Sequence, residues 1–199
     1  TKIESIFSEA IKSGHELGAS LAIEHEGEMV VNLFGGHKDE KREKTWEQKT
    51  WVNVFSVTKA ITATCIAKLI DEGKLDFNEK VVTYWPEYGN NGKENTKVSD
   101  FLCHRAGMFG FSEGIPITNW TKFEHFSKAL EQQKPIREPG SSQGYHALTY
   151  GWLVGEIVKR IDGRSVGKYF EEEIATPFGI DFKIGLDQED FSNCADMIM

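Results

Sequence analysis

Apolar residues recur along the first part of the chain with two different periods, and each period predicts one kind of element. Residues 3–16 carry apolar side chains at helical spacing, which predicts an amphipathic helix that Gly18 ends. Two apolar runs, 21–23 and 29–34, then flank the polar stretch EHEGE, a pattern that predicts a β-hairpin turning near Gly27. The charged run HKDEKREKTWEQKT follows and is expected to be a solvated loop.

The longest apolar segment of the later chain covers residues 56–72. Apolar residues lie on more than one face of a helix drawn through it, which predicts a buried helix. Gly73 stands where a left-handed C-terminal cap is wanted, so the helix is expected to end there.

Shorter helices are predicted further along the chain. One is expected at 98–102, with Ser99 as a cap outside its first turn. A longer one is expected in YHALTYGWLVGEIVKRIDG, with Gly163 as its stop, and a last one at 165–174, before Pro177.

This order of elements predicts an α+β fold. A helix and a hairpin of antiparallel sheet are expected over about residues 1–50, and a mainly helical part over about 51–199. A two-stranded hairpin is marginal on its own and needs partner strands, and none is evident later in the chain. We therefore predict a single domain, truncated at its C-terminal end, whose sheet is incomplete in residues 1–199 and whose missing strands follow Met199.

The charge balance and the apolar runs argue against two kinds of partner. The 199 residues carry a formal net charge of -8, whereas phosphate binding needs a clustered excess of Lys and Arg, so we expect no nucleic-acid partner. No apolar run reaches the roughly 18 residues typical of a membrane-spanning helix, so no membrane span is expected.

Cysteine and histidine usage argues against a metal site. Cys65, Cys103 and Cys194 form an odd set without ligand spacing, and the histidines are scattered. We expect reduced, mostly buried thiols and an intracellular, cytoplasmic setting. The triplet at 119–121, NWT, fits a glycosylation acceptor, but such triplets are frequent by chance.

Ser56 and Lys59 stand three residues apart at the start of the apolar helix, in NVFSVTKAITATCIAKL. That spacing puts both side chains on one face, so the Lys59 amine can reach the Ser56 hydroxyl. A free serine hydroxyl is a poor nucleophile and needs a base, a role for Lys59 if its surroundings disfavour the charged form. The positive end of the helix dipole favours negative charge on an attacked carbonyl.

The same spacing recurs at Ser165 and Lys168, where we predict an ordinary helix cap. Spacing alone is therefore weak evidence. For Ser56, too, a cap with a lysine stretched over apolar surface is the structural alternative.

Three separated segments together resemble the serine β-lactamase and penicillin-binding protein superfamily, in particular its class C-like esterases and peptidases. VFSVTKAITATCIAKLIDEGKLDFNEKV resembles the segment with the nucleophile and base, here Ser56 and Lys59. VSDFLCHRAGM resembles a loop that ends in His, two small or polar residues and Gly. EPGSSQGYHALTYGWLVGEIVKRIDG resembles the segment with the catalytic tyrosine, here Tyr145. The resemblance implies a β-lactamase/transpeptidase-like fold over nearly the whole chain.

The resemblance also implies an acyl-enzyme mechanism in which Tyr145 protonates the leaving group and then activates water. The chain departs from the family pattern at Ala147, where an Asn or Ser is usual, so we favour ester over β-lactam hydrolysis. The family's third element is a Lys or His, then Ser or Thr, then Gly on a strand that also carries an oxyanion donor. We expect it to be missing here and to follow Met199. Losing one such donor costs about 3 kcal/mol, so a fragment would be slow or inactive.

Other candidate residues are weaker. GSSQG matches a nucleophile elbow with Ser142, but no apolar strand precedes it and the only later histidine is His146, four residues on. Cys103 beside His104 is expected to be a buried thiol next to a loop-bracing histidine. Tyr150, the rival tyrosine, is expected in the core.

We therefore predict a serine hydrolase for small-molecule ester or amide substrates, β-lactams included, with no metal or organic cofactor. The alternatives are a catalytically silent binding or scaffold protein, and a penicillin-binding sensor that is acylated without turnover. The oligomeric state stays open.

Overall fold

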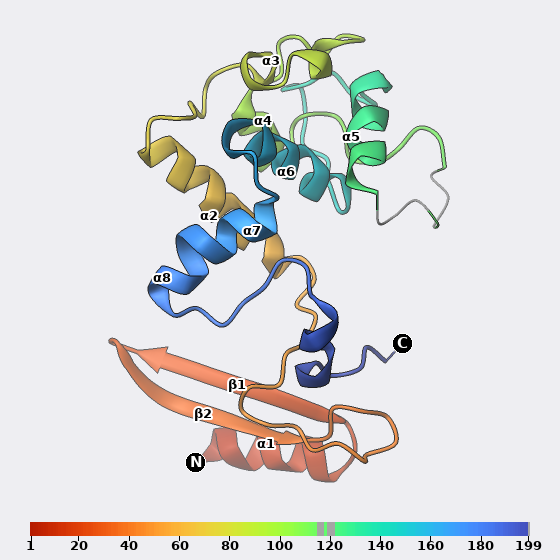
Figure 1. The fold of residues 1–199 in the computed structure, drawn as a ribbon. Coiled ribbons are helices and arrows are strands. Elements are labelled where there is room, and N and C mark those ends of the chain that lie inside the picture. Colours follow the sequence, from red (N-terminus) through yellow and green to blue (C-terminus); the bar gives the residue numbers. More distant parts are fainter. Residues whose placement is uncertain (115–117, 119–121, 199) are drawn as a thin grey trace. The chain divides into compact units, whose positions relative to one another are not determined.

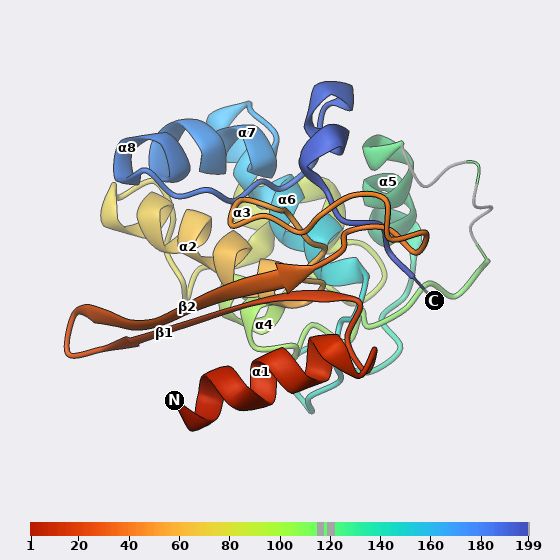
Figure 2. The same cartoon turned by 90° about the horizontal axis from the view of Figure 1, so that it is seen from below.

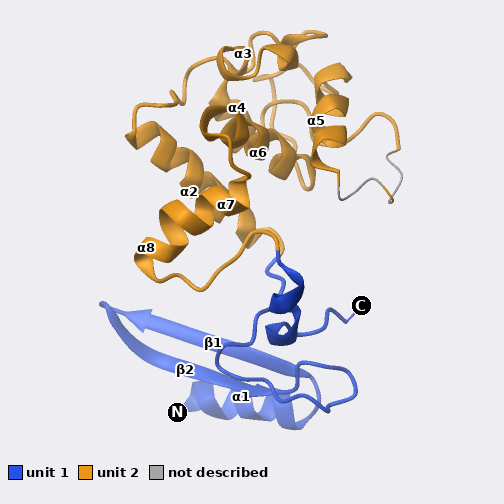
Figure 3. Cartoon of the chain, viewed as in Figure 1, with its two compact units in different colours: residues 1–54, 186–199 blue, residues 55–185 orange. Residues whose placement is uncertain are grey.

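The computed structural model describes residues 1–114, 118 and 122–198, which fall into two compact units (Figure 3). Unit 1 comprises Thr1–Val54 and Leu186–Met199, and unit 2 comprises Phe55–Gly185. The glycosylation-like triplet at 119–121 lies outside the described residues. The assignment of the whole chain to one domain stays a prediction.

Unit 1 contains the predicted helix and hairpin. Helix α1 (Lys2–Lys12) contacts strand β2 (Glu28–Gly36), which pairs antiparallel with β1 (Gly18–His25) (Figure 2). The turn residues Glu26 and Gly27 have φ of 52° and 81°, the left-handed pair that matches the twist of a two-residue hairpin. The hairpin prediction and its turn at Gly27 are confirmed.

The end of α1 corrects two expectations. The helix ends at Lys12, and Gly14 (φ 76°) provides the left-handed residue after it, whereas Gly18 is the first residue of β1. The chain also contains one triplet of the type that we expected to be missing, Lys12-Ser13-Gly14. It closes α1 and does not lie on a strand, and neither β1 nor β2 carries such a triplet.

The charged run after β2 forms a loop, as predicted. The Asp39 carboxylate accepts the backbone N–H groups of Glu43 (3.2 Å) and Lys44 (2.7 Å), which closes a tight turn. The 3₁₀-helix η4 (Gln188–Asn193) belongs to the same unit. The next residue, Cys194, forms an isolated parallel β-bridge with Trp51 through the backbone.

Among the residues that the structure describes, the regular elements of unit 2 are helices joined by loops (Figure 1). Helix α6 (Thr149–Asp162) is its centre, because it contacts α2, α3, α4, α5 and α7 and buries one long face in the core. The other elements are α2 (Val57–Asp71), α3 (Val81–Tyr84), the 3₁₀-helix η1 (Pro86–Gly89), α4 (Val98–Leu102), α5 (Phe123–Gln132), α7 (Val166–Phe170), the π-helix η3 (Glu171–Ala175) and α8 (Thr176–Phe178).

The two long helices end where glycine predicted they would. Gly73 and Gly163 have φ of 69° and 93°, a conformation that side chains with a Cβ rarely adopt. The predicted all-round burial of α2 is wrong, because its buried residues lie on one stripe. They are Thr62, Cys65, Ile66 and Leu69.

Two shorter predictions are corrected as well. Ser99 lies inside α4, and the turn is capped instead by Asp100, whose carboxylate accepts the Lys97 N–H at 2.9 Å. The last helical stretch continues past Pro177 to Phe178, because a π turn precedes the proline and places it in the first turn of α8. All three cysteines are free, but only Cys65 is buried, so the expectation of mostly buried thiols is wrong.

Candidate active site

Ser56 occupies the N-cap position of α2 without acting as a cap. Its backbone is helical (φ -74°, ψ -6°), and its side chain makes no capping hydrogen bond. The preceding residue, Phe55, has φ of 46°, a strained value for an aromatic residue. The backbone thus turns the Ser56 hydroxyl away from the N–H groups of its own helix.

The side chains of Tyr145 and Lys59 both reach that hydroxyl. Tyr145 Oη donates to Ser56 Oγ at 2.6 Å, and Lys59 Nζ donates to the same oxygen at 3.1 Å. Lys59 Nζ also lies 4.9 Å from the centroid of the Tyr145 ring. The structure therefore brings together all three residues singled out in the sequence, from α2 and from the loop before α6.

The amine of Lys59 has a second acceptor, the backbone carbonyl of Ala147 at 2.8 Å. The Ala147 side chain itself offers no amide or hydroxyl. No sequence signal marks a main-chain acceptor, since any residue at this position carries a carbonyl. The two hydrogen bonds hold the amine between the serine and the tyrosine loop.

Electrostatics favour the ionised form of the phenol. Hydrogen bonding to Ser56 and then to Lys59, together with the charge of Lys59, holds the pKa of Tyr145 below its usual range. A phenol with a lowered pKa gives up its proton more readily than an ordinary tyrosine. The group can thus donate a proton to a leaving group and later take one back.

The loop before α6 that carries Tyr145 packs against the loop of residues 104–112. Gly107 (φ 69°) allows a close approach there, because a Cβ at this position would collide with the Arg137 carbonyl. The Gly144 N–H donates to His104 O at 2.9 Å, and a Cβ at Gly144 would overlap the Phe109 ring. His104 thus braces the loop, as expected.

The remaining candidates fall where the sequence placed them, with one exception. Tyr150 is buried in α6 and its hydroxyl donates to Lys59 O at 3.3 Å, so it is a core residue. Ser142 is half-buried in a loop that no strand immediately precedes in the described part of the chain. Cys103 is exposed, so its predicted burial is wrong: it follows the last turn of the short helix α4.

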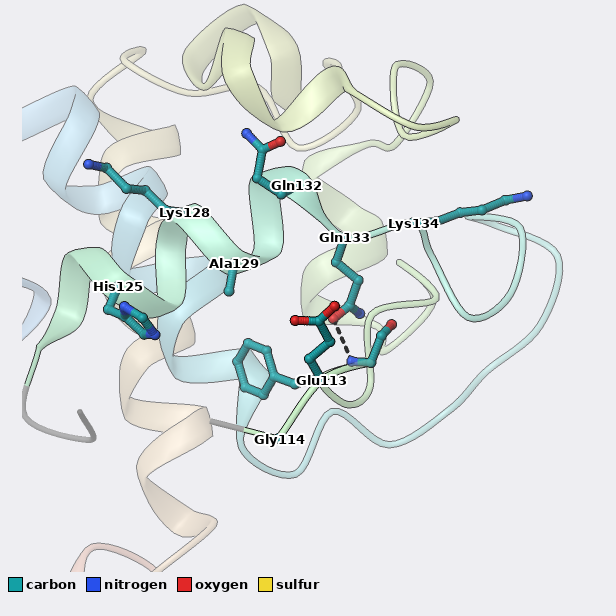
Figure 4. A pocket seen from close by; sticks show the side chains of 10 residues that line it. Glu113, Gly114, His125, Lys128, Ala129, Gln132, Gln133 and Lys134 are labelled. Carbon is teal, nitrogen blue, oxygen red and sulfur yellow. Dashed lines mark hydrogen bonds between the residues drawn. The ribbon is translucent and has the colours of Figure 1, made fainter. Parts of the chain in front are cut away.

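A hollow of about 620 Å³ lies along α5, between this helix and residues 111–114 (Figure 4). Gln133 crosses its wall: its amide donates to Gly110 O at 2.8 Å and accepts the Ser112 N–H at 2.8 Å. The hollow is lined by Phe111, Ser112, Glu113, Gly114, His125, Lys128, Ala129, Gln132, Gln133 and Lys134. Gln133 fixes the far end of the loop that begins at His104.

Within 1–114, 118 and 122–198, no group of three or more His, Cys, Asp or Glu side chains is arranged to hold a metal ion. In the same residues, no helix has both the length and the apolar character needed to span a membrane.

Comparison with known proteins agrees with this fold. Residues 3–198 match the Beta-lactamase family, so the chain belongs to the β-lactamase family. Its α+β architecture is that of the β-lactamase/transpeptidase fold, as solved relatives show. A penicillin-binding protein homologue from Caulobacter crescentus is 38% identical with a TM-score of 0.92, and a family VIII carboxylesterase is 36% identical with a TM-score of 0.92.

Both likenesses cover 99% of this chain, but only 53% and 55% of those two proteins. The esterase/beta-lactamase LipL of Mycobacterium tuberculosis is 34% identical over 167 residues, which are 82% of this chain and 38% of LipL. The chain thus spans about half the length of the solved structures and less of LipL.

Proposed function

We propose that the full-length protein is a serine hydrolase that forms an acyl-enzyme on Ser56, with Lys59 as base and Tyr145 as proton relay. The observation that carries the proposal is the convergence of the Tyr145 phenol and the Lys59 amine on Ser56 Oγ, at 2.6 and 3.1 Å. A serine used only for packing or capping has no need of two such partners.

The geometry suggests how the proton moves. The Ser56 hydroxyl loses its proton to the neutral form of the Lys59 amine as its oxygen attacks the substrate carbonyl. The phenol then protonates the leaving alcohol, and in the second half-reaction it activates water against the acyl group. Backbone N–H groups at the start of α2 lie at the positive end of the helix and favour the oxyanion.

Esters are the substrates that we propose. The side chain of Ala147 brings no polar group toward a substrate, while its carbonyl serves Lys59. Phe55 and Val57, on either side of Ser56, are 68% and 59% exposed, which suits an apolar acyl group. Two relatives carry the word esterase in their names, LipL and the family VIII carboxylesterase.

The test uses the full-length protein with p-nitrophenyl butyrate and, separately, a chromogenic cephalosporin. We expect Ser56-dependent turnover of the ester, lost on the order of 10⁴-fold or more in Ser56→Ala. Ser165→Ala is the matched control, because the same spacing there belongs to a helix cap, and it should keep the wild-type rate.

Other results would point to the alternatives. A stable adduct on Ser56 with the cephalosporin and no ester turnover identifies a sensor. Neither turnover nor adduct identifies a binding or scaffold protein and refutes the proposed function.

A further inference from the structure

Two histidines, His104 and His146, lie next to Tyr145 and are joined by a hydrogen bond. The backbone N–H of His146 donates to His104 Nδ1 at 3.1 Å, and that of Gly144 donates to His104 O at 2.9 Å. The residues on both sides of Tyr145 are therefore attached to one residue of another loop. The His104 and Tyr145 rings also meet edge to face, with centroids 4.8 Å apart.

The hydrogen bonds determine which ring nitrogen carries the proton. His146 is fully buried, and its Nε2 accepts the Met108 N–H at 3.2 Å. The ring proton is therefore on Nδ1, which donates to Gly144 O at 2.7 Å. In His104 the Nδ1 is an acceptor, so its proton is on Nε2. A second proton on either ring would place a ring N–H opposite the backbone N–H that the ring now accepts, and that hydrogen bond would break.

The loop that carries His104 is itself held in place. His104 has φ of 60°, and the Thr149 hydroxyl donates to Met108 O at 2.6 Å, four residues further on. The loop that supports the tyrosine is therefore tied to the start of α6.

The groups around the histidine pair favour its neutral form. Lys59 of α2 acts on His104 with a positive charge, Tyr150 of α6 lies 5.3 Å from its ring, and no acidic group is part of these contacts. Burial, and then Lys59, lowers the pKa of His104, and burial lowers the pKa of His146 to about 4.

The groups on the other side of His146 are also uncharged or positively charged. Phe109 lies against the His146 ring at 6.3 Å, and Arg137 stacks on Phe109 at 5.5 Å.

We propose that His104 and His146 form an acid-sensitive latch, in which neutral His104 positions the Tyr145 phenol on Ser56 and protonation of either ring releases it. His104 is thus a positioning residue that acts through Tyr145. The inference rests on the proposed function, since it describes the regulation of that hydrolase site.

The kinetic test compares two variants of the full-length protein, with p-nitrophenyl butyrate from pH 3.5 to 9. Asparagine and glycine both tolerate the positive φ at position 104. His104→Asn keeps an acceptor for the His146 N–H that does not titrate, whereas His104→Gly removes it. We expect His104→Gly to lower kcat about 10²-fold with little change in KM. His104→Asn should lose less than tenfold, and its acid limb should move to lower pH by at least one unit.

His15→Asn, at an exposed position after α1, is the matched control and should keep the wild-type profile. A wild-type kcat in His104→Gly, or an unshifted acid limb in His104→Asn, would overturn the latch.

A second readout does not depend on activity. Nitrogen-15 spectra of the histidines at pH 7 should show His104 protonated at Nε2 and His146 at Nδ1. The opposite tautomer in either ring refutes the latch whatever the kinetics. If the wild type shows the expected tautomers but no Ser56-dependent turnover, the proposed function fails and the latch is no longer a regulator of it.

Discussion

Two segments of this chain share the pattern Ser-x-x-Lys at a helix start, and the structure uses them differently. Ser165 has an extended backbone (φ -63°, ψ 155°), and its hydroxyl accepts the Lys168 N–H at 3.2 Å. Ser56 has a helical backbone and no cap bond, so its hydroxyl is left for Lys59 and Tyr145. The backbone at the serine, more than the spacing, decides between a cap and a candidate nucleophile.

The lysines differ for a reason that is visible in the sequence. Lys168 is followed at i+3 and i+4 by Glu171 and Glu172, with which it forms ion pairs at 3.0 and 3.3 Å. The corresponding positions after Lys59 are Thr62 and Ala63, which offer no carboxylate. An amine without a carboxylate on its own helix is free to turn to the serine and to Ala147.

The largest expected effect separates the two lysines. Lys59→Met should lower kcat/KM for the ester about 10⁴-fold, because the base is lost while the side-chain length is kept. Lys168→Met should leave kcat/KM within twofold, since the amine pairs only with surface carboxylates. Steady-state kinetics of both variants decide the matter, and equal losses would end the distinction between the segments.

Tyr145→Phe should have the next largest effect and lower kcat by about 10²- to 10³-fold. The ring is 55% exposed, so the thermal midpoint should stay close to that of the wild type. Paired kinetics and melting curves test this. A lower melting temperature with unchanged kcat would make Tyr145 a packing residue instead.

As the pH falls, the stabilisation that depends on His146 should be lost first, and the stabilisation from Glu172, near Ser165, should be lost second. The pKa of His146 is lowered to about 4 from an ordinary value near 6.5, so the unfolded chain takes up the proton first. This histidine therefore lowers the free energy of unfolding as pH falls from about 6.5 to 4, by up to about 3 kcal/mol.

Near Ser165, hydrogen bonds first to Arg164 and then to Lys168 lower the pKa of Glu172. Its stabilising effect is present above the ordinary glutamate pKa and is lost only as pH falls further, through the lowered value. Urea unfolding at pH 7, 5.5 and 4.5 should show the first loss in the wild type and a much smaller one in His146→Gln. An equal loss in both would contradict the assignment to His146.

The smallest effect is on stability at Ser165. Removal of its cap bond in Ser165→Ala should cost about 1 kcal/mol of unfolding free energy with no loss of activity. Ser56→Ala breaks no cap bond and should be stable within about 0.5 kcal/mol. Denaturant unfolding of both variants provides the comparison, and a larger loss in Ser56→Ala would reverse it.

The sequence predicted what local periodicity and glycine encode. The hairpin at Gly27, α2 with its end at Gly73, and α6 with its end at Gly163 follow from patterns within a few residues. It misjudged features that depend on more distant contacts. The burial of only one face of α2 is set by its neighbours, and the passage of the last helix through Pro177 depends on a π turn that has no local signature.

The candidate site, like the fold, was predicted only in part from the sequence. Ser56, Lys59 and Tyr145 were found from motifs, and the structure places them within hydrogen-bonding distance of one oxygen. The bond between His104 and His146 could not be predicted, because it joins residues 42 positions apart through a backbone N–H.

The main-chain anchor of Lys59 has a practical consequence for protein engineering. Because the acceptor is the carbonyl of residue 147 and not its side chain, mutagenesis at this position leaves the amine tethered. Saturation libraries at 147 can therefore introduce amide, hydroxyl or bulky side chains next to Tyr145 and His146 without removing the main-chain acceptor of the Lys59 amine.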